Sequence, residues 1–155
     1  MMLKKPVGFV WKILPPWLRL GIIRATQRKF TVSAAAVVVN KRGEVLLLNH
    51  VLRPFSGWGL PGGFLTTGEQ AEVAICREIR EETGVELQDL KMFRVRTLGQ
   101  HIEILFSATT DGQPEVRSRE ITELGFFEID SLPEQMSPAQ KRLVREVVGQ
   151  FTVDS

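Results

Sequence analysis

The chain has 155 residues, of which 43% are hydrophobic and 25% are charged, a composition typical of one globular domain. This length can bury a single core of ordinary size and leaves no room within it for a second independent domain. The lone cysteine, Cys76, excludes an internal disulfide framework and a cysteine-based zinc cluster. It is read as a plain packing residue, and a reducing, cytoplasmic location is the simplest expectation.

The formal net charge of the chain is only +2, but the charged residues are distributed unevenly along it. Residues 1–30 contain seven basic residues and no acidic residue, whereas the rest of the chain holds 13 basic and 18 acidic residues. The same first segment is rich in apolar side chains, including Trp11 and Trp17. We therefore predict a basic, amphipathic, helical N-terminal extension over 1–30, followed by a domain over 31–155.

Three roles are open for this extension. Pro15-Pro16 divides it, and Pro16 can start a short helix from Trp17 to about Gln27. The apolar run is too short to span a bilayer and has no signal-peptide cleavage site. Packing against the domain or against a second subunit, as in a homodimer, is favoured over membrane contact through residues 1–28. No pattern of a nucleic-acid-binding module is present, so no nucleic-acid partner is expected.

The domain begins with two apolar runs, residues 31–40 and 45–48, separated by turn residues. This pattern predicts a β-hairpin of two core strands. A loop rich in Gly and Pro, residues 56–63, then leads into a helix predicted over 69–83. Thr67 and Gln70 suit a capping box at its start, and Gly84 suits its end.

The most specific pattern lies on this helix and its approach: G-x5-E-x7-R-E-I-x-E-E-x-G-V, over residues 63–85. Residues three and four apart share a helix face, so Glu78, Glu81 and Glu82 bring their carboxylates together. Three like charges need a cation, and carboxylate oxygens favour a hard divalent ion such as Mg²⁺ or Mn²⁺. The alternative is a solvated acidic face. An apolar stripe at helical spacing anchors the opposite face and argues for a built site: Ala71, Ala74, Ile75 and Ile79.

Three further strands and a last helix follow. Strands are predicted around 91–97, 101–109 and 124–129. Ser137 can cap the last helix, with Pro138 at its first position and Gln140 three residues after the cap. This order of elements predicts an α/β fold with a mixed β-sheet flanked by helices.

Residues 63–85 resemble the signature box of the Nudix hydrolases at every specified position, and residues 58–63 are similar to the approach to that box. The resemblance covers about one-sixth of the chain. It implies the Nudix-type α/β/α sandwich and a divalent metal cofactor. It also implies hydrolysis of a pyrophosphate bond in a nucleoside diphosphate linked to another moiety, by water attack at phosphorus.

The resemblance also implies roles for individual residues around the metal. Glu78 and Glu82 are the expected principal ligands, and the carbonyl of Gly62 is expected to add an oxygen. Glu81 is expected to serve as a ligand or as the general base. The absence of a Cβ in the glycine pair lets the backbone approach the metal closely.

Other roles concern residues at the edges of the box. Glu69 and Arg77 are expected to form a structural ion pair, with a direct phosphate contact by Arg77 as the alternative. Glu120 is a candidate general base outside the box, with Glu123 as its rival. Either acid could instead be a solvated loop residue.

Candidates for substrate binding lie outside the box: Arg53, Trp58 and His101, together with His50 and Phe55. Trp58 could instead pack in the core, and His101 could face solvent. The proline that marks the ADP-ribose subgroup is absent downstream, and the chain has no tyrosine, which disfavours the dinucleoside-polyphosphate subgroup.

Two other functions remain open. A Nudix-like domain can act as a non-catalytic nucleotide sensor, although the intact carboxylates favour catalysis. The basic first segment could alternatively bring a membrane-associated isoprenoid-pyrophosphate hydrolase to its substrate.

Overall fold

The computed structural model describes residues 11–51 and 57–151. The chain forms two compact units, residues 1–30 and 31–155. In the first unit, helix α2 (Pro16–Thr26) begins at the proline that the sequence indicated, and none of its residues is buried. No helix in the described part of the chain has the length and apolar character needed to cross a membrane.

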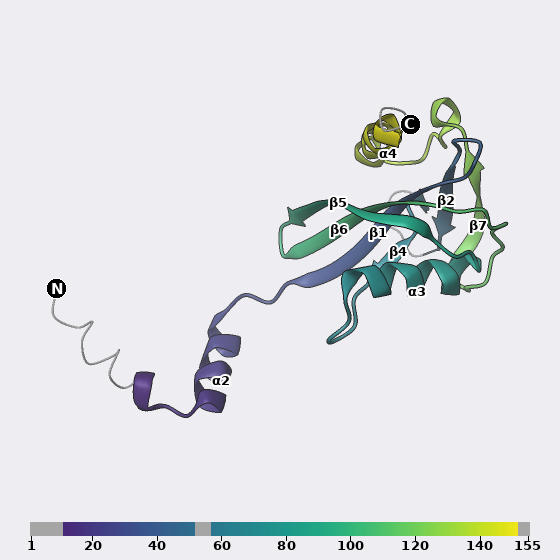
Figure 1. Cartoon of the computed structure of the whole chain (residues 1–155). Coiled ribbons are helices and arrows are strands. Elements are labelled where there is room, and N and C mark those ends of the chain that lie inside the picture. Colours follow the sequence, from purple (N-terminus) through teal and green to yellow (C-terminus); the bar gives the residue numbers. More distant parts are fainter. Residues whose placement is uncertain (1–10, 52–56, 152–155) are drawn as a thin grey trace. The chain divides into compact units, whose positions relative to one another are not determined.

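The second unit contains a seven-stranded mixed sheet in its described residues (Figure 1). Its central path runs β3-β2-β1-β6-β5, while β4 pairs with β1 and β7 pairs with β2. β1 and β6 are parallel, and the other pairs are antiparallel. The strands are β1 (Thr31–Val39), β2 (Val45–His50), β3 (Trp58–Gly59), β4 (Gly62–Phe64), β5 (Gln88–Leu98), β6 (His101–Thr109) and β7 (Ile121–Phe127).

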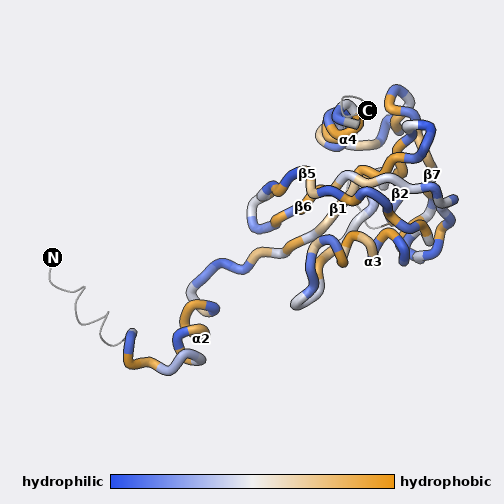
Figure 2. Tube along the Cα trace, viewed as in Figure 1, coloured by the Kyte–Doolittle hydropathy of each residue, from blue (hydrophilic) through white to orange (hydrophobic). Residues whose placement is uncertain are grey.

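Two helices cover the sheet from opposite sides: α3 (Ala71–Thr83) and α4 (Pro138–Phe151) (Figure 1). Side chains of β1 alternate between the two resulting cores, because successive residues of a strand point to opposite faces. Ala36 and Val38 pack in the α3 core, and Val37 packs in the α4 core. Hydrophobic and hydrophilic residues mix along both helices (Figure 2), as expected when one helix face lies on a sheet. The predicted mixed sheet flanked by helices is confirmed.

The N-terminal boundary of the box helix differs from the prediction. α3 begins at Ala71, and its cap residue, Gln70, makes no side-chain capping bond. The predicted capping box is therefore wrong. The residues before the helix instead form a turn, in which the Glu69 amide donates to the Thr66 carbonyl at 3.1 Å. The predicted end is confirmed, because Gly84 takes the left-handed conformation with φ of 75°.

The position at which a strand begins or ends depends on its pairing with the neighbouring strand more than on the local sequence. The last strand was predicted over 124–129, but β7 begins at Ile121, where it pairs with His50 of β2. It ends at Phe127, before the short 3-10 helix η1 (Ile129–Ser131). The first hairpin is confirmed by the pairing of Val39 with Val45. The start of α4 is confirmed as well, since the Gln140 amide donates to Ser137 Oγ at 3.2 Å.

Replacing Leu47 by alanine should lower the free energy of unfolding by about 2–5 kcal/mol, because it empties a fully buried site in the core under α4. Chemical denaturation monitored by circular dichroism measures this change. Leu98→Ala is the matched control, since that leucine on β5 is 52% exposed. Equal losses in the two variants would contradict the assigned core.

Candidate active site

A cavity of about 420 Å³ opens beside β1, β4 and α3. Its walls combine backbone from the glycine pair before α3 with acidic side chains from three separate parts of the chain. The polar and glycine residues that line it include Ser33, His50, Gly62, Gly63, Glu78, Glu82, Glu103 and Glu120. Two carboxylates of the box helix, those of Glu78 and Glu82, therefore face a concave surface.

Gly62 and Gly63 bring the backbone of β4 close to its neighbours. Gly62 has φ of +148°, and a Cβ there would lie 2.3 Å from the carbonyl oxygen of Ala34. A Cβ on Gly63 would lie 2.3–2.6 Å from the carboxylate atoms of Glu78. The first glycine thus permits the close pairing of β4 with β1, and the second leaves space for a box carboxylate.

Arg77 and Glu69 form a two-bond ion pair across the start of the helix. The Arg77 Nε atom donates to Glu69 Oε1 at 2.8 Å, and Nη2 donates to Oε2 at 2.9 Å. The Thr66 amide and hydroxyl donate to the same carboxylate at 2.9 and 3.0 Å. The Arg77 guanidinium, followed by these Thr66 donors, lowers the pKa of Glu69 from 4.5 to about 2. These bonds fix the approach loop onto α3.

The same guanidinium reaches the other box carboxylates. Arg77 Nη1 lies 2.9 Å from Glu78 Oε1 and 3.5 Å from Glu81 Oε2. Hydrogen bonds to Glu69 and then to Glu78 raise the pKa of Arg77. One cation thus offsets the repulsion among acids on a single helix face.

Glu82 occupies the most enclosed position among the box acids. It is 6% exposed in the last turns of α3, and its Oε1 atom lies 3.8 Å from His50 Nδ1 at the end of β2. A carboxylate so far from water requires compensating charge or hydrogen bonds. This environment suits a residue held in place to bind a cation.

The structure brings five of the proposed site residues to one cavity: His50, Gly62, Glu78, Glu82 and Glu120. Glu81 lies outside the residues that line it, and the Glu81 side chain is 62% exposed. The rival base, Glu123, is exposed on β7 and is also outside the lining. Arg53 and Phe55 lie outside the described residues.

Trp58 and His101 occupy different surroundings. The Trp58 ring packs edge-on against Phe127, with centroids 5.0 Å apart, beside the core under α4. The His101 ring nitrogens lie 2.8 Å from Thr31 Oγ1 and 2.9 Å from Ser33 Oγ. The ring also stands edge-on to Phe64, at 5.7 Å between centroids. His101 is therefore held against a wall that includes two cavity-lining residues.

The donor atoms at the cavity fit a hard divalent cation. Glu78, Glu82 and the glycine pair offer oxygen donors only, which is the ligand set such ions prefer. In the described part of the chain, however, no three acidic, histidine or cysteine side chains converge on one point. The Glu78 carboxylate forms an ion pair with Arg77, and the Glu82 carboxylate lies beside the His50 ring.

Among the polar and aromatic residues of the cavity, the sequence reasoning missed Ser33, Phe64 and Glu103. Ser33 and Glu103 are brought together by the parallel pairing of β1 with β6, where they are direct partners. Glu103 is further fixed by an ion pair with Arg96 of β5. Ser33 could have been noticed as a lone serine in a run of Ala and Val. Glu103 could not, because nothing in the local sequence indicates that β6 pairs with β1.

Comparison with known proteins identifies the family. The family model described as "NUDIX domain" matches residues 29–147. The chain belongs to the NUDIX family. It is 32% identical over 103 residues to an ADP-ribose pyrophosphatase of Methanocaldococcus jannaschii, covering 62% of this chain and 61% of that protein.

Two further similarities support this assignment. The chain is 30% identical over 120 residues to a putative 8-oxo-dGTP diphosphatase of Bacillus subtilis, covering 76% of this chain and 79% of that protein. A crystal structure of a MutT NUDIX hydrolase from Burkholderia pseudomallei superposes with a TM-score of 0.68 and 30% identity, covering 77% of this chain and 98% of that one. The protein is a NUDIX hydrolase, a family whose members generally use divalent metal ions.

Two neighbouring glycine substitutions should have different effects. Gly62→Ala places a methyl group against strand backbone and should lower the free energy of unfolding by about 1–3 kcal/mol. Gly63→Ala meets only the end of the Glu78 side chain, so stability should change little while hydrolase activity falls because the carboxylate is displaced. Thermal unfolding and activity assays on both variants test this, and full activity in Gly63→Ala would contradict the role given to the glycine.

Glu69→Gln should lower the unfolding temperature near neutral pH by removing the charge that pairs with Arg77. The pKa of Glu69 is lowered from 4.5 to about 2 in the folded state. The contribution of this carboxylate to the free energy of unfolding is therefore present in full above about pH 4.5 and is lost as the pH falls toward 2. The difference in unfolding temperature between wild type and Glu69→Gln should therefore shrink as pH decreases below 4.5.

Thermal unfolding from pH 7 to the lowest pH at which both proteins fold measures this difference. Glu72→Gln is the control, because it removes an exposed carboxylate from the same helix without touching the Arg77 pair. A difference for Glu69→Gln that stays constant through acid pH would contradict the assigned pair.

Proposed function

We propose that this NUDIX hydrolase cleaves a pyrophosphate bond in a nucleoside diphosphate linked to another moiety. The observation that carries the proposal is the shared cavity of Gly62, Glu78, Glu82 and Glu120, which combines oxygen donors with a separate acidic side chain. The names of the archaeal pyrophosphatase and the bacterial diphosphatase support the same class of bond.

The proposed cofactor is Mg²⁺ or Mn²⁺, held by Glu78, Glu82 and the Gly62 carbonyl. When bound, the ion would neutralise phosphate charge and polarise the phosphorus–oxygen bonds. Glu81 is a further proposed ligand or base: its side chain is 62% exposed and lies beside the guanidinium of Arg77, with Oε2 3.5 Å from Arg77 Nη1. Arg77 would remain the brace that positions the approach loop.

Glu120 is the proposed general base. It lines the cavity, whereas its rival Glu123 does not. Its carboxylate would take a proton from the attacking water as the water oxygen bonds to phosphorus. The bond between phosphorus and the bridging oxygen then breaks, and the leaving phosphate departs with the bonding electrons.

The group beyond the pyrophosphate would lie along the wall formed by Ser33, Phe64 and Glu103. Phe64 is 63% exposed and offers a face for stacking, while the serine and the glutamate offer hydrogen-bonding groups. His101 would support this wall through its contacts with Ser33 and Phe64. A nucleoside carries both a flat base and hydroxyl groups, so it matches this combination.

The catalytic unit in this proposal is the domain over residues 31–155, and residues 1–30 are an extension outside it. The division into two compact units supports this boundary. The match of the family model from residue 29 supports it as well.

A hydrolysis screen with Mg²⁺ and Mn²⁺ tests the proposal. The panel should contain ADP-ribose, 8-oxo-dGTP, nucleoside triphosphates, nucleotide sugars and isoprenoid pyrophosphates. Selective turnover of a nucleotide is expected, with a loss on the order of 100-fold in Glu82→Gln. Glu72→Gln, on the exposed face of the same helix, should keep full activity. Tight nucleotide binding without turnover would indicate a sensor, and turnover restricted to isoprenoid pyrophosphates would contradict the substrate class.

Glu120→Gln should lower kcat by roughly 100-fold with little change in KM, because an amide cannot accept the proton from water. Steady-state kinetics on the preferred substrate measure both constants. Glu123→Gln is the matched control on the same segment and should keep its kcat. Loss of turnover in the control alone would transfer the role of base to Glu123.

A further inference from the structure

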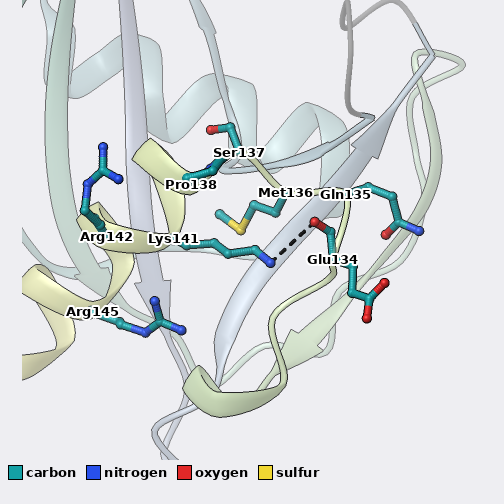
Figure 3. A pocket seen from close by; sticks show the side chains of 8 residues that line it. All are labelled: Glu134, Gln135, Met136, Ser137, Pro138, Lys141, Arg142 and Arg145. Carbon is teal, nitrogen blue, oxygen red and sulfur yellow. Dashed lines mark hydrogen bonds between the residues drawn. The ribbon is translucent and has the colours of Figure 1, made fainter.

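A second cavity, of about 490 Å³, lies at the start of α4 (Figure 3). Three cationic side chains of the helix line it: Lys141, Arg142 and Arg145. Buried Met136 also lines it, on the segment that leads into the helix. This site, which we call the α4 pocket, is concave, basic and partly apolar.

The α4 pocket is separate from the candidate active site. The two cavities share no lining residue. α4 and α3 lie on opposite sides of the sheet (Figure 1), so the box carboxylates and the basic residues of α4 face different regions of the domain. A ligand in the α4 pocket would therefore not be part of the metal site.

The positive charge of the α4 pocket is largely uncompensated. Within residues 11–51 and 57–151, none of its three cations forms an ion pair with a carboxylate. The acid on the same helix, Glu146, pairs with Arg94 of β5. Glu134 lines the pocket, but its carboxylate points away from the Lys141 ammonium, which donates instead to the Glu134 carbonyl at 3.4 Å (Figure 3).

The position of one of these cations on the helix adds to the effect. The first turn of α4 has no acidic residue, and the helix dipole makes this end positive, which disfavours the Lys141 ammonium there. Arg142 and Arg145 lie further along the helix, and with Lys141 they outnumber Glu134, the one acid among the residues that line the cavity. The cavity therefore carries a net positive charge. A multivalent anion would relieve the repulsion.

We propose that the α4 pocket binds a phosphate-bearing anion, either free diphosphate or the phosphate of a mononucleotide. Two guanidinium groups can each donate a pair of hydrogen bonds to phosphate oxygens, and the lysine adds a point charge. The volume is large enough for a diphosphate or for a nucleotide phosphate with part of its sugar. This inference does not depend on the proposed function, because it uses none of the residues of the active-site cavity.

Titration of the full chain with sodium diphosphate, and separately with AMP, tests the proposal by two-dimensional ¹H–¹⁵N NMR. EDTA is included so that no divalent ion can hold phosphate at the box carboxylates. Saturable shifts are expected in the amides of residues 135–145, and they should weaken as salt is raised. Shifts with diphosphate alone would identify free oligophosphate as the ligand, and shifts with AMP would identify a nucleotide.

The double variant Arg142→Gln, Arg145→Gln should reduce the affinity at least tenfold while leaving the rest of the spectrum unchanged. Lys91→Gln removes an exposed cation from β5 and is the matched control, which should bind as wild type does. The proposal is wrong if neither anion shifts these amides, or if the shifts persist in the double variant. Because the box is untouched, hydrolase activity of the double variant separates this result from a failure of the proposed function.

Discussion

The candidate site depends on one cation, the guanidinium of Arg77. It binds Glu69 through two hydrogen bonds and also contacts Glu78 and Glu81, so it organises three carboxylates around a single positive charge. Without it, the acids of α3 would repel one another, and the approach loop would lose its attachment to the helix. The spacing of acids in the box therefore places one carboxylate, Glu69, where it ties the approach loop to Arg77, and two others, Glu78 and Glu82, along the cavity.

The two faces of the sheet serve different purposes. On one side, the apolar stripe of α3 is packed into the core and fixes the helix, with Glu78 and Glu82 lining the cavity. On the other side, α4 completes a second core, and its basic residues line a cavity that shares no residue with the candidate active site. β1 lies between these cores and has buried residues on both faces, which explains its nearly continuous run of Ala and Val.

The sequence predicted the parts of the fold and site that are encoded locally. The box spacing singled out Glu78, Glu81 and Glu82. The two predicted principal ligands, Glu78 and Glu82, line the cavity, whereas Glu81 does not, and their role as metal ligands stays a prediction. Gly84 and Ser137 marked helix ends correctly. Features that depend on the pairing of segments distant in the chain could not be predicted from the sequence. The start of β7 is set by its pairing with β2, and Glu103 reaches the cavity only because β6 lies parallel to β1.

The direct test of the account is Mn²⁺ binding measured by electron paramagnetic resonance on wild type, Glu82→Gln and Glu72→Gln. If the buried carboxylate and its neighbours hold the metal, wild type and Glu72→Gln should bind Mn²⁺ with equal affinity, and Glu82→Gln should bind it at least tenfold more weakly. Unchanged affinity in Glu82→Gln would show that this buried carboxylate is not a metal ligand.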